Sequence, residues 1–214
     1  MNLQELAGEI NKALEDWSKN KDKLVVAIDG YTGVGKTTII KELEKINFDI
    51  VIVHRDDLLL DRQTIENLLS NTEDKSLVWE LRVTDNEKIE KLIQAFKNGE
   101  KIFETYIRDE VTGKIDKLKK YDLDKKIMII EGVFMFHPEL PIDKLFDKRI
   151  YLEGDQEKID ERRIKREKAR WGDEYFPETH PDSYLRHIII ALKRYFSTHK
   201  PHTIADLVLK VDFK

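Results

Sequence analysis

The chain has 214 residues, enough for one domain of ordinary size with a sizeable core, and 40% of them are apolar. Its 38 basic and 42 acidic side chains nearly cancel to a formal charge of −4. This balance disfavours a nucleic-acid binder, which more often has a net basic charge, and the absence of cysteine excludes disulfides, thiolate zinc sites and a cysteine nucleophile and fits a reducing cytosol.

Apolar residues near the N-terminus recur at intervals of three and four, from Leu3 to Trp17, which predicts an amphipathic helix. The run 24–28 is short, unbroken and rich in β-branched residues, as in a strand buried on both faces of a parallel sheet. Residues 36–46 return to helical spacing, and residues 50–53 are again continuously apolar. Strand, glycine-rich loop, helix and strand together predict a βαβ unit.

The rest of the chain continues the alternation of helices and strands. After weaker helical segments, a clear helix is predicted between an N-cap at Asp85 or Asn86 and a stop at Gly99. The segment 101–117 is interpreted as a small hairpin with strands at 102–107 and 111–115. The remaining predicted elements are the strands 127–130 and 150–152, the helices 155–170 and 183–196, and the strand 207–211.

Strands separated by helices predict an α/β fold of three layers, doubly wound around a mainly parallel five-stranded sheet. Ligands are expected beyond the carboxyl ends of the strands. No internal repeat, low-complexity tract or flexible linker is present, so we expect a single domain over residues 1–214. Its parts are the N-terminal helix within 1–22, the hairpin insertion within 101–117 and a charged helical segment within 155–172.

The sequence shows no sign of export or membrane insertion. No basic segment followed by an apolar one stands at the N-terminus, and nowhere do roughly eighteen apolar residues run together. We therefore expect a cytoplasmic protein with neither a membrane nor a nucleic acid as partner. Whether the chain forms a homo-oligomer stays open.

Residues 30–37 read Gly-Tyr-Thr-Gly-Val-Gly-Lys-Thr and match the pattern GxxxxGK[ST] between a buried strand and a helix. Glycines let the backbone turn so that successive amides point inward at a helix N-terminus, where an anion binds. Lys36 would reach the β- and γ-phosphates, and the Thr37 hydroxyl would coordinate Mg²⁺. A glycine-rich turn with an incidental lysine is the alternative. The pattern predicts that a nucleoside triphosphate is bound by Gly30, Thr32, Gly33, Val34, Gly35, Lys36, Thr37 and Thr38.

Acidic residues follow two of the predicted strands. Asp56 and Asp57 come after the second strand, where a carboxylate can accept the proton of an attacking hydroxyl and touch the water shell of a metal. Glu131 ends the strand 127–130 and is a candidate to support Mg²⁺. The alternatives are that Asp56 or Asp57 caps the next helix and that Glu131 is a solvated strand-end acid. Asp29 is expected to be a structural hydrogen-bond acceptor.

Arg162, Arg166 and Arg170 are spaced four apart, so they share one face of a helix, with Arg163 adjacent. Guanidinium groups in a row repel one another unless an anion lies among them. They can provide positive charge for a γ-phosphate in the transition state and close over it as a lid. A solvated helix whose arginines pair with its own acids is the alternative. The glycine-rich loop upstream favours the lid.

These residues together resemble the group of P-loop kinases that includes uridine kinase, phosphoribulokinase and nicotinamide riboside kinase. The resemblance spans about residues 24–212 and is carried by the segments 28–38, 55–57, 129–134, 146–147 with the strand 150–152, and 162–167. It implies the P-loop kinase fold with a helical lid. It also implies transfer of the γ-phosphoryl group of ATP, with Mg²⁺, to a hydroxyl of a small molecule.

The resemblance also implies roles for single residues. Asp56 becomes the base, Glu131 supports Mg²⁺, and the lid arginines hold phosphates. Tyr106, with Arg108 nearby, corresponds to the tyrosine that binds the nucleoside, although an ordinary aromatic strand residue is the alternative. The chain departs from the uridine and riboside kinases in having leucines at 58–60, where those usually have aromatic residues.

We therefore expect an ATP-dependent kinase acting on a nucleoside-like or sugar-like metabolite. A regulatory ATPase with weak or no kinase activity is the alternative, and the joint presence of base, metal acid and lid cations favours the kinase. The donor triphosphate, the acceptor and the choice between Asp56 and Asp57 as base stay open. The histidines lack metal-ligand spacing and are expected at the surface or in packing. The predicted site comprises the catalytic residues Lys36, Asp56, Arg162 and Arg166, of which Arg162 also contacts the nucleotide, the acceptor-binding residues Asp56, Tyr106, Arg108 and Arg166, and the metal-site residues Thr37, Asp56 and Glu131.

Overall fold

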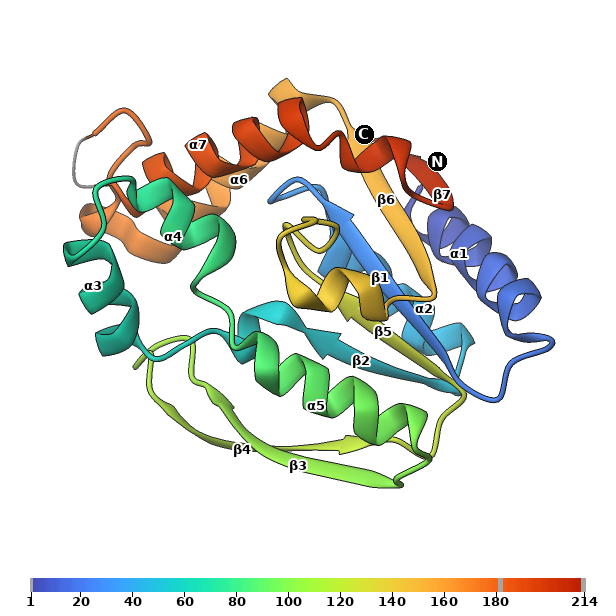
Figure 1. Cartoon of the computed structure of the whole chain (residues 1–214). Helices are drawn as coiled ribbons and strands as arrows, with labels where there is room; N and C mark the ends of the chain where they lie inside the picture. The colour runs from blue at the N-terminus through green and yellow to red at the C-terminus, as the bar shows by residue number, and fades with distance from the viewer. Residues whose placement is uncertain (1, 181–182, 213–214) are drawn as a thin grey trace.

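The computed structural model describes residues 2–180 and 183–212, and its centre is a five-stranded sheet flanked by helices (Figure 1). The strand order is β2-β5-β1-β6-β7, and every neighbouring pair is parallel. The predicted α/β architecture is confirmed, because each predicted sheet strand is present. The strands are β1 Leu24–Gly30, β2 Ile50–His54, β5 Ile127–Glu131, β6 Lys148–Gly154 and β7 Leu207–Val211.

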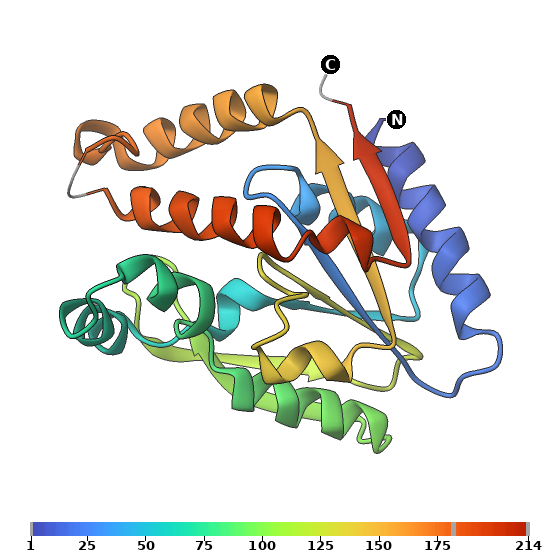
Figure 2. The ribbon, with the colours of Figure 1, turned by 45° about the horizontal axis from the view of Figure 1, so that its top comes forward.

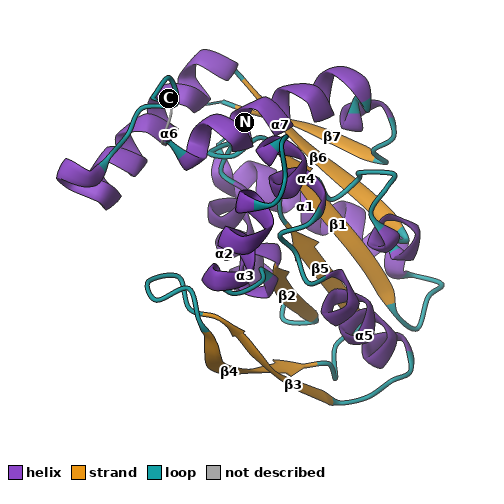
Figure 3. Cartoon of the chain, turned by 60° about the vertical axis from the view of Figure 1, so that its left-hand side comes forward, coloured by secondary structure: helices purple, strands orange, loops and turns teal. Residues whose placement is uncertain are grey.

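Helices lie on both faces of this sheet, and Figure 3 shows α2 and α5 on opposite sides of it. The helix α1 packs on α2, and α4 packs on α7. No helix in the described part of the chain is long and apolar enough to cross a membrane. The helices are α1 Leu3–Ser18, α2 Lys36–Ile46, α3 Arg62–Ser70, α4 Lys75–Leu81, α5 Asn86–Lys97, α6 Gln156–Trp171 and α7 Tyr184–Thr198, with short 3₁₀ turns η1 Arg55–Leu58, η2 Pro141–Leu145, η3 Gly172–Glu174 and η4 Pro201–Thr203.

Side-chain caps fix where the helices begin. Asn2 and Glu5 form a reciprocal capping box at the start of α1. For α5 the sequence left two N-cap candidates, and the structure has Asp85, whose Oδ1 accepts a hydrogen bond from the Lys88 amide at 2.9 Å. The lid helix α6 begins after Asp155, which caps it in the same way through the Lys158 amide.

The predicted hairpin is present as β3 Ile102–Arg108 and β4 Ile115–Asp122, which pair with each other and not with the main sheet (Figure 3). The prediction that its second strand covers 111–115 is wrong. Asp109 Oδ1 accepts hydrogen bonds from the amides of Val111 and Thr112, so residues 109–113 form a turn and the strand starts later. An ion pair of 2.5 Å between Lys119 of β4 and Asp57 of η1 ties the hairpin to the edge of the sheet.

The lid helix α6 and the helix α7 extend side by side from the end of the sheet at which β1 and β6 finish (Figure 2). The hydrophobic core fills the layers between the sheet and its helices, and β1 is buried along its whole length. A second, smaller cluster of Ile65, Val78 and Val83 joins α3, α4 and the segment that follows. Because α6 extends from the end of the sheet at which β1 and β6 finish, the carboxyl ends of the strands lie next to the lid helix.

The packing of β1 against β6 predicts the effect of a methyl group at Gly30. A Cβ there would lie 2.6 Å from the carbonyl oxygen of Leu152, and the φ of +154° disfavours any other residue. We expect Gly30→Ala to lower the free energy of unfolding by about 2–4 kcal/mol. Gly8→Ala is the control, since its Cβ would meet no atom within 4 Å in the middle of α1, and it should raise stability by about 0.5–1 kcal/mol. Urea unfolding followed by circular dichroism measures both, and a Gly30→Ala protein as stable as the parent would contradict the packing argument.

Candidate functional site

The loop between β1 and α2 has a backbone that only glycine adopts easily. Gly30, Gly33 and Gly35 have φ values of 154°, 91° and 103°, and Gly35 stands at the N-cap of α2. A Cβ on Gly33 would lie 3.3 Å from the Cβ of Arg163, so the lid helix packs directly on the loop. Val34 is buried beneath the loop, while Thr32, Thr37 and Thr38 line its solvent side or the first turn of α2. Amides at the start of an eleven-residue helix fit an anion such as a phosphate.

Lys36 lies inside this loop. Its ammonium group donates hydrogen bonds to the carbonyl oxygens of Gly30 at 2.8 Å and Tyr31 at 3.3 Å, and the residue is buried. Burial lowers the pKa of Lys36, against the opposing charges of Glu131, Asp29 and Asp56. The role of Lys36 in reaching a triphosphate stays a prediction.

Glu131 lies beside the loop at the end of β5. Its Oε1 accepts a hydrogen bond from Thr37 Oγ1 at 3.2 Å and lies 2.8 Å from His54 Nδ1, since β2 and β5 pair in register at His54 and Glu131. Burial alone would raise the pKa of Glu131, but the hydrogen bonds from His54 and Thr37 and the charge of Lys36 lower it below the usual value. The hydroxyl and carboxylate oxygens of Thr37 and Glu131 are ligands of the hard type that suits Mg²⁺.

Sequence reasoning missed His54, which was expected at the surface or in packing. Its ring is about one third exposed and its Nδ1 faces Glu131, whose hydrogen bond raises the pKa of His54 despite the opposing effect of burial. The signal was the position of His54 at the end of a predicted strand. That position alone did not indicate a contact with Glu131, because the sequence does not show that β2 pairs with β5.

Asp56 and Asp57 lie in η1, directly after β2, and their carboxylates have different surroundings. The Asp57 carboxylate is engaged by Lys119, whereas Asp56 is exposed and its carboxylate accepts no hydrogen bond from any described residue. Although Asp56 is open to solvent, the protein around it removes hydration from the carboxylate and raises its pKa; Glu131 acts in the same direction, and Arg55 and Lys36 oppose it. The N-cap of α3 is Asp61, so neither Asp56 nor Asp57 caps that helix.

Gly132 explains why η1 can lie against the end of β5. A Cβ on Gly132 would stand 2.7 Å from the Cβ of Arg55, so a larger residue would displace Arg55. The Arg55 guanidinium is buried over the ring of Phe134 at 5.6 Å. The glycine after Glu131 thus lets the two strand ends, and the acids on them, come close together.

The lid helix presents two kinds of arginine. Arg163 is buried and forms ion pairs with Asp160 of the same helix at 3.0 Å and with Glu178, in the segment after the helix, at 2.6 Å. Arg162 and Arg166 are exposed, as expected for cations that face a ligand. Arg166 contacts Glu167 at 3.0 Å, and its charge contributes to the lowered pKa of Lys36, so it lies within electrostatic reach of the loop. The alternative of a helix whose arginines pair with its own acids holds in part.

The hairpin brings one of its two predicted residues toward the site. Tyr106 is 56% exposed on the outward face of β3, opposite the similarly exposed Leu118, and within the described residues no hydrogen bond joins it to Asp56. The acceptor-binding role of Tyr106 stays a prediction without support from its position. A register shift after Ile107 turns Arg108 inward, and Asp56 is among the charges that act on it.

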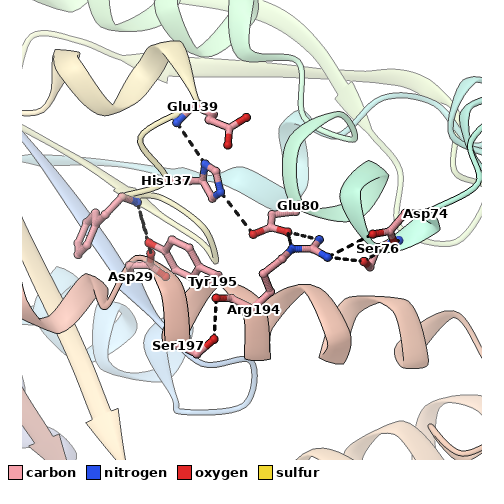
Figure 4. A network of polar contacts seen from close by, with 10 residues as sticks. Asp29, Asp74, Ser76, Glu80, His137, Glu139, Arg194, Tyr195 and Ser197 are labelled. Carbon is pink, nitrogen blue, oxygen red and sulfur yellow. Dashed lines mark hydrogen bonds and ion pairs between the residues drawn. The ribbon is translucent and has the colours of Figure 1, made fainter.

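A buried polar network lies behind the loop (Figure 4). Asp29 accepts hydrogen bonds from the Tyr195 hydroxyl at 2.6 Å and the Phe136 amide at 3.4 Å, which is the structural role expected of it, and burial raises its pKa. Arg194, which directly precedes Tyr195 in α7, contacts Glu80 of α4 and donates a hydrogen bond to Ser76 at 3.0 Å. The network holds α7 against both α4 and the loop.

Glu80, His137 and His199 have ligand atoms within 4.8 Å of one another, a spacing that a metal ion could bridge. His137 Nδ1 accepts a hydrogen bond from the Glu139 amide at 3.2 Å, so the neutral ring carries its proton on Nε2, which faces Glu80 at 3.3 Å. A protonated Nε2 cannot bind a metal, and Arg194 already neutralises Glu80. The three side chains are therefore interpreted as part of the buried network.

Comparison with known proteins agrees with this geometry. The model of the phosphoribulokinase/uridine kinase family matches residues 25–186. Among solved structures, a possible uridine kinase from Bacillus stearothermophilus aligns with a TM-score of 0.64 at 20% identity over 94% of this chain and 99% of that one. The D-glycerate 3-kinase of Cryptococcus neoformans var. grubii gives 0.62 at 17% identity over 90% and 87%. Phosphoribulokinase of Rhodobacter spheroides gives 0.59 at 14% identity over 90% and 73%. A search of curated protein sequences found no match.

The contact between His54 and Glu131 predicts a titration. We expect the pKa of His54, measured by NMR, to lie above 6.5 in the parent and to return toward that value in Glu131→Gln. Because the folded-state pKa is raised, this contact stabilises the fold fully below about pH 6.5, and the stabilisation is lost as the pH rises through the folded-state value. His187 serves as control, since burial lowers its pKa and Glu131→Gln should not affect it. A His54 pKa at or below 6.5 in the parent would refute the contact.

Proposed function

We propose that the chain is a kinase that transfers the γ-phosphoryl group of ATP to a hydroxyl of a small metabolite. The proposal starts from the family to which the chain belongs, the phosphoribulokinase/uridine kinase family. The observation that carries the proposal is the state of Asp56. Of the acids around the loop, Asp29, Asp57 and Glu131 are engaged by other protein groups, whereas Asp56 is exposed with no partner among the described residues. A carboxylate left open beside a phosphate-binding loop is suited to take a proton from an acceptor.

The residues present fit ATP and Mg²⁺. The amides of residues 30–38 and the Lys36 ammonium would hold the triphosphate, and Thr37 and Glu131 would hold the metal. When bound, Mg·ATP would supply the phosphoryl group and a divalent charge that neutralises the phosphate oxygens. The already formed contact between Thr37 and Glu131 keeps both oxygen donors on the same side of the loop.

Asp56 would act as general base. It would accept the hydroxyl proton while the acceptor oxygen bonds to the γ-phosphorus and the bond to the β–γ bridging oxygen breaks. Its raised pKa makes the carboxylate a stronger base than an ordinary aspartate. Lys36, Arg162 and Arg166 would balance negative charge on the transferred group, and α6 would exclude water from it.

The alternative function, a regulatory ATPase without an acceptor, differs from the kinase in whether an alcohol is needed for ADP release. Hydrolysis uses water, so no pocket for an alcohol is required and no added alcohol should raise the rate of ADP release. Release of ADP that depends on an added alcohol therefore favours the kinase, and release that ignores every alcohol favours the regulator.

Substitution of Asp56 tests its proposed role. We expect Asp56→Asn to lower kcat roughly 10²- to 10⁴-fold, because the amide cannot accept the proton, while ATP affinity measured by calorimetry stays near that of the parent. Asp57→Asn is the matched control: it removes an equal charge one residue away and should mainly loosen the contact with Lys119. Equal values of kcat for Asp56→Asn and the parent would remove Asp56 from the mechanism.

The pH dependence gives a second test of the same residue. Because the base must be ionised, kcat/KM for the acceptor should fall as the pH is lowered through the pKa of Asp56, which desolvation by the surrounding protein raises above its ordinary 3.8. Circular dichroism over the same range separates this loss from unfolding. An acidic limb with a midpoint at or below 3.8 would contradict the proposed environment of Asp56.

A further inference from the structure

Two arginines from different elements meet at the turn of the hairpin. Arg62, the first residue of α3, and Arg108, the last of β3, both approach Gly113: Arg62 Nε and Arg108 Nη2 lie 2.9 and 3.2 Å from the position that a Cβ on Gly113 would take. The turn is also fastened to α3, because the Arg62 amide donates to the Gly113 carbonyl at 2.9 Å. The Arg62 guanidinium donates to the carbonyl of Val111 at 3.0 Å. The two cations are thus held close together by the backbone.

Within the described residues, no carboxylate forms an ion pair with either arginine. Arg108 forms no ion pair there, and its Nε is buried without a hydrogen-bond partner. Glu110, the acid of the turn, is about three quarters exposed and reaches Arg170 at 3.8 Å. Burial lowers the pKa of Arg108, and the charges of Arg62 and Arg170 lower it further, while the charges of Asp56 and Glu110 act in the opposite direction. Two adjacent guanidinium groups with an unsatisfied buried donor are costly unless an anion completes the arrangement.

The position of the pair relates it to the proposed reaction. Arg108 lies within electrostatic reach of Asp56, and Arg170, at the end of the lid helix, approaches the same turn through Glu110. These arginines come from α3, β3 and the C-terminal end of α6. The loop between β1 and α2 instead contacts the middle of α6, where Gly33 packs on Arg163. The hairpin pair is thus carried by elements other than the loop between β1 and α2, and its Arg108 interacts electrostatically with Asp56.

We propose that the acceptor is an anionic alcohol, with a phosphate monoester or carboxylate bound between Arg62 and Arg108 and with Arg170 adding charge from the lid. This inference rests on the proposed kinase function and names its substrate class. Guanidinium groups bind both anions in a bidentate manner. A neutral nucleoside would leave the pair without a counter-charge, so it would be a poor acceptor.

Direct binding of an anion tests the arginine pair without the reaction. Inorganic phosphate, and acetate in a second arm, is titrated into the full chain with Mg²⁺ and a non-hydrolysable ATP analogue present at saturation, and the arginine Nε–Hε signals are followed by NMR. We expect the signals of Arg62 and Arg108 to shift with saturation, and the stronger of the two anions identifies the group. The shift should persist in Lys120→Gln, which removes a charge from the far part of the same hairpin, and the Arg62 shift should weaken in Arg108→Gln. No shift of either signal in the parent, with either anion, would overturn the inference.

Kinetics then separates the acceptor class from the kinase function. ADP release from Mg·ATP is compared for pairs in which an anionic group replaces or esterifies one hydroxyl of the neutral member and leaves the other hydroxyls as acceptors: glycerol with glycerate, ribose with ribose 5-phosphate, and uridine with uridine monophosphate. We expect stimulation by anionic members, and a KM for the anionic acceptor raised roughly ten- to a hundredfold in Arg108→Gln and Arg62→Gln with the KM for ATP unchanged. Arg108→Lys should recover part of the loss. Stimulation by neutral members alone would overturn the acceptor class and keep the kinase, whereas absence of Mg·ATP binding would refute the kinase itself.

Discussion

The carboxylate of Glu131 joins three parts of the chain at the carboxyl edge of the sheet. It lies at the end of β5, accepts a hydrogen bond from the Thr37 hydroxyl at the start of α2 and contacts His54 at the end of β2. It is also the charge that most favours the ionised form of the buried Lys36. A buried ammonium group without such a counter-charge would be strongly disfavoured, so the geometry of the loop depends on this acid before any ligand binds.

The same loop determines where the lid lies. Gly33 has no side chain, so Arg163 and the helix that carries it can pack against the loop backbone, while the ion pairs of Arg163 with Asp160 and Glu178 compensate its buried charge. The buried arginine is thereby a structural part of α6, whereas Arg162 and Arg166 of the same helix are exposed. Movement of the loop on binding a triphosphate would be passed to the lid through this contact.

The sequence predicted the parts of the site that depend on local pattern and missed the parts that depend on neighbours. Glycine spacing placed the loop, and unbroken apolar runs placed the strands that end at Glu131 and His54. The contact between those two residues follows from strand order, which local pattern does not contain. Tyr106 was assigned by family resemblance, but alternation along β3 turns it outward, and Asp109 closes the turn earlier than the apolar pattern of 111–115 indicated. Arg163 was grouped with its neighbours because charge alone does not tell which face of a helix is buried.

The distribution of charge around Asp56 links the two proposals. A base between cations loses strength, since each cation favours the ionised form; Arg55 and Lys36 act in this way, while desolvation and Glu131 act against them. An uncompensated pair at Arg62 and Arg108 would add positive potential at the acceptor side and weaken the base further. An anion on that pair would cancel this potential at the moment when the acceptor hydroxyl arrives. A negatively charged acceptor would therefore restore the strength of the base that deprotonates it, and a neutral acceptor would not.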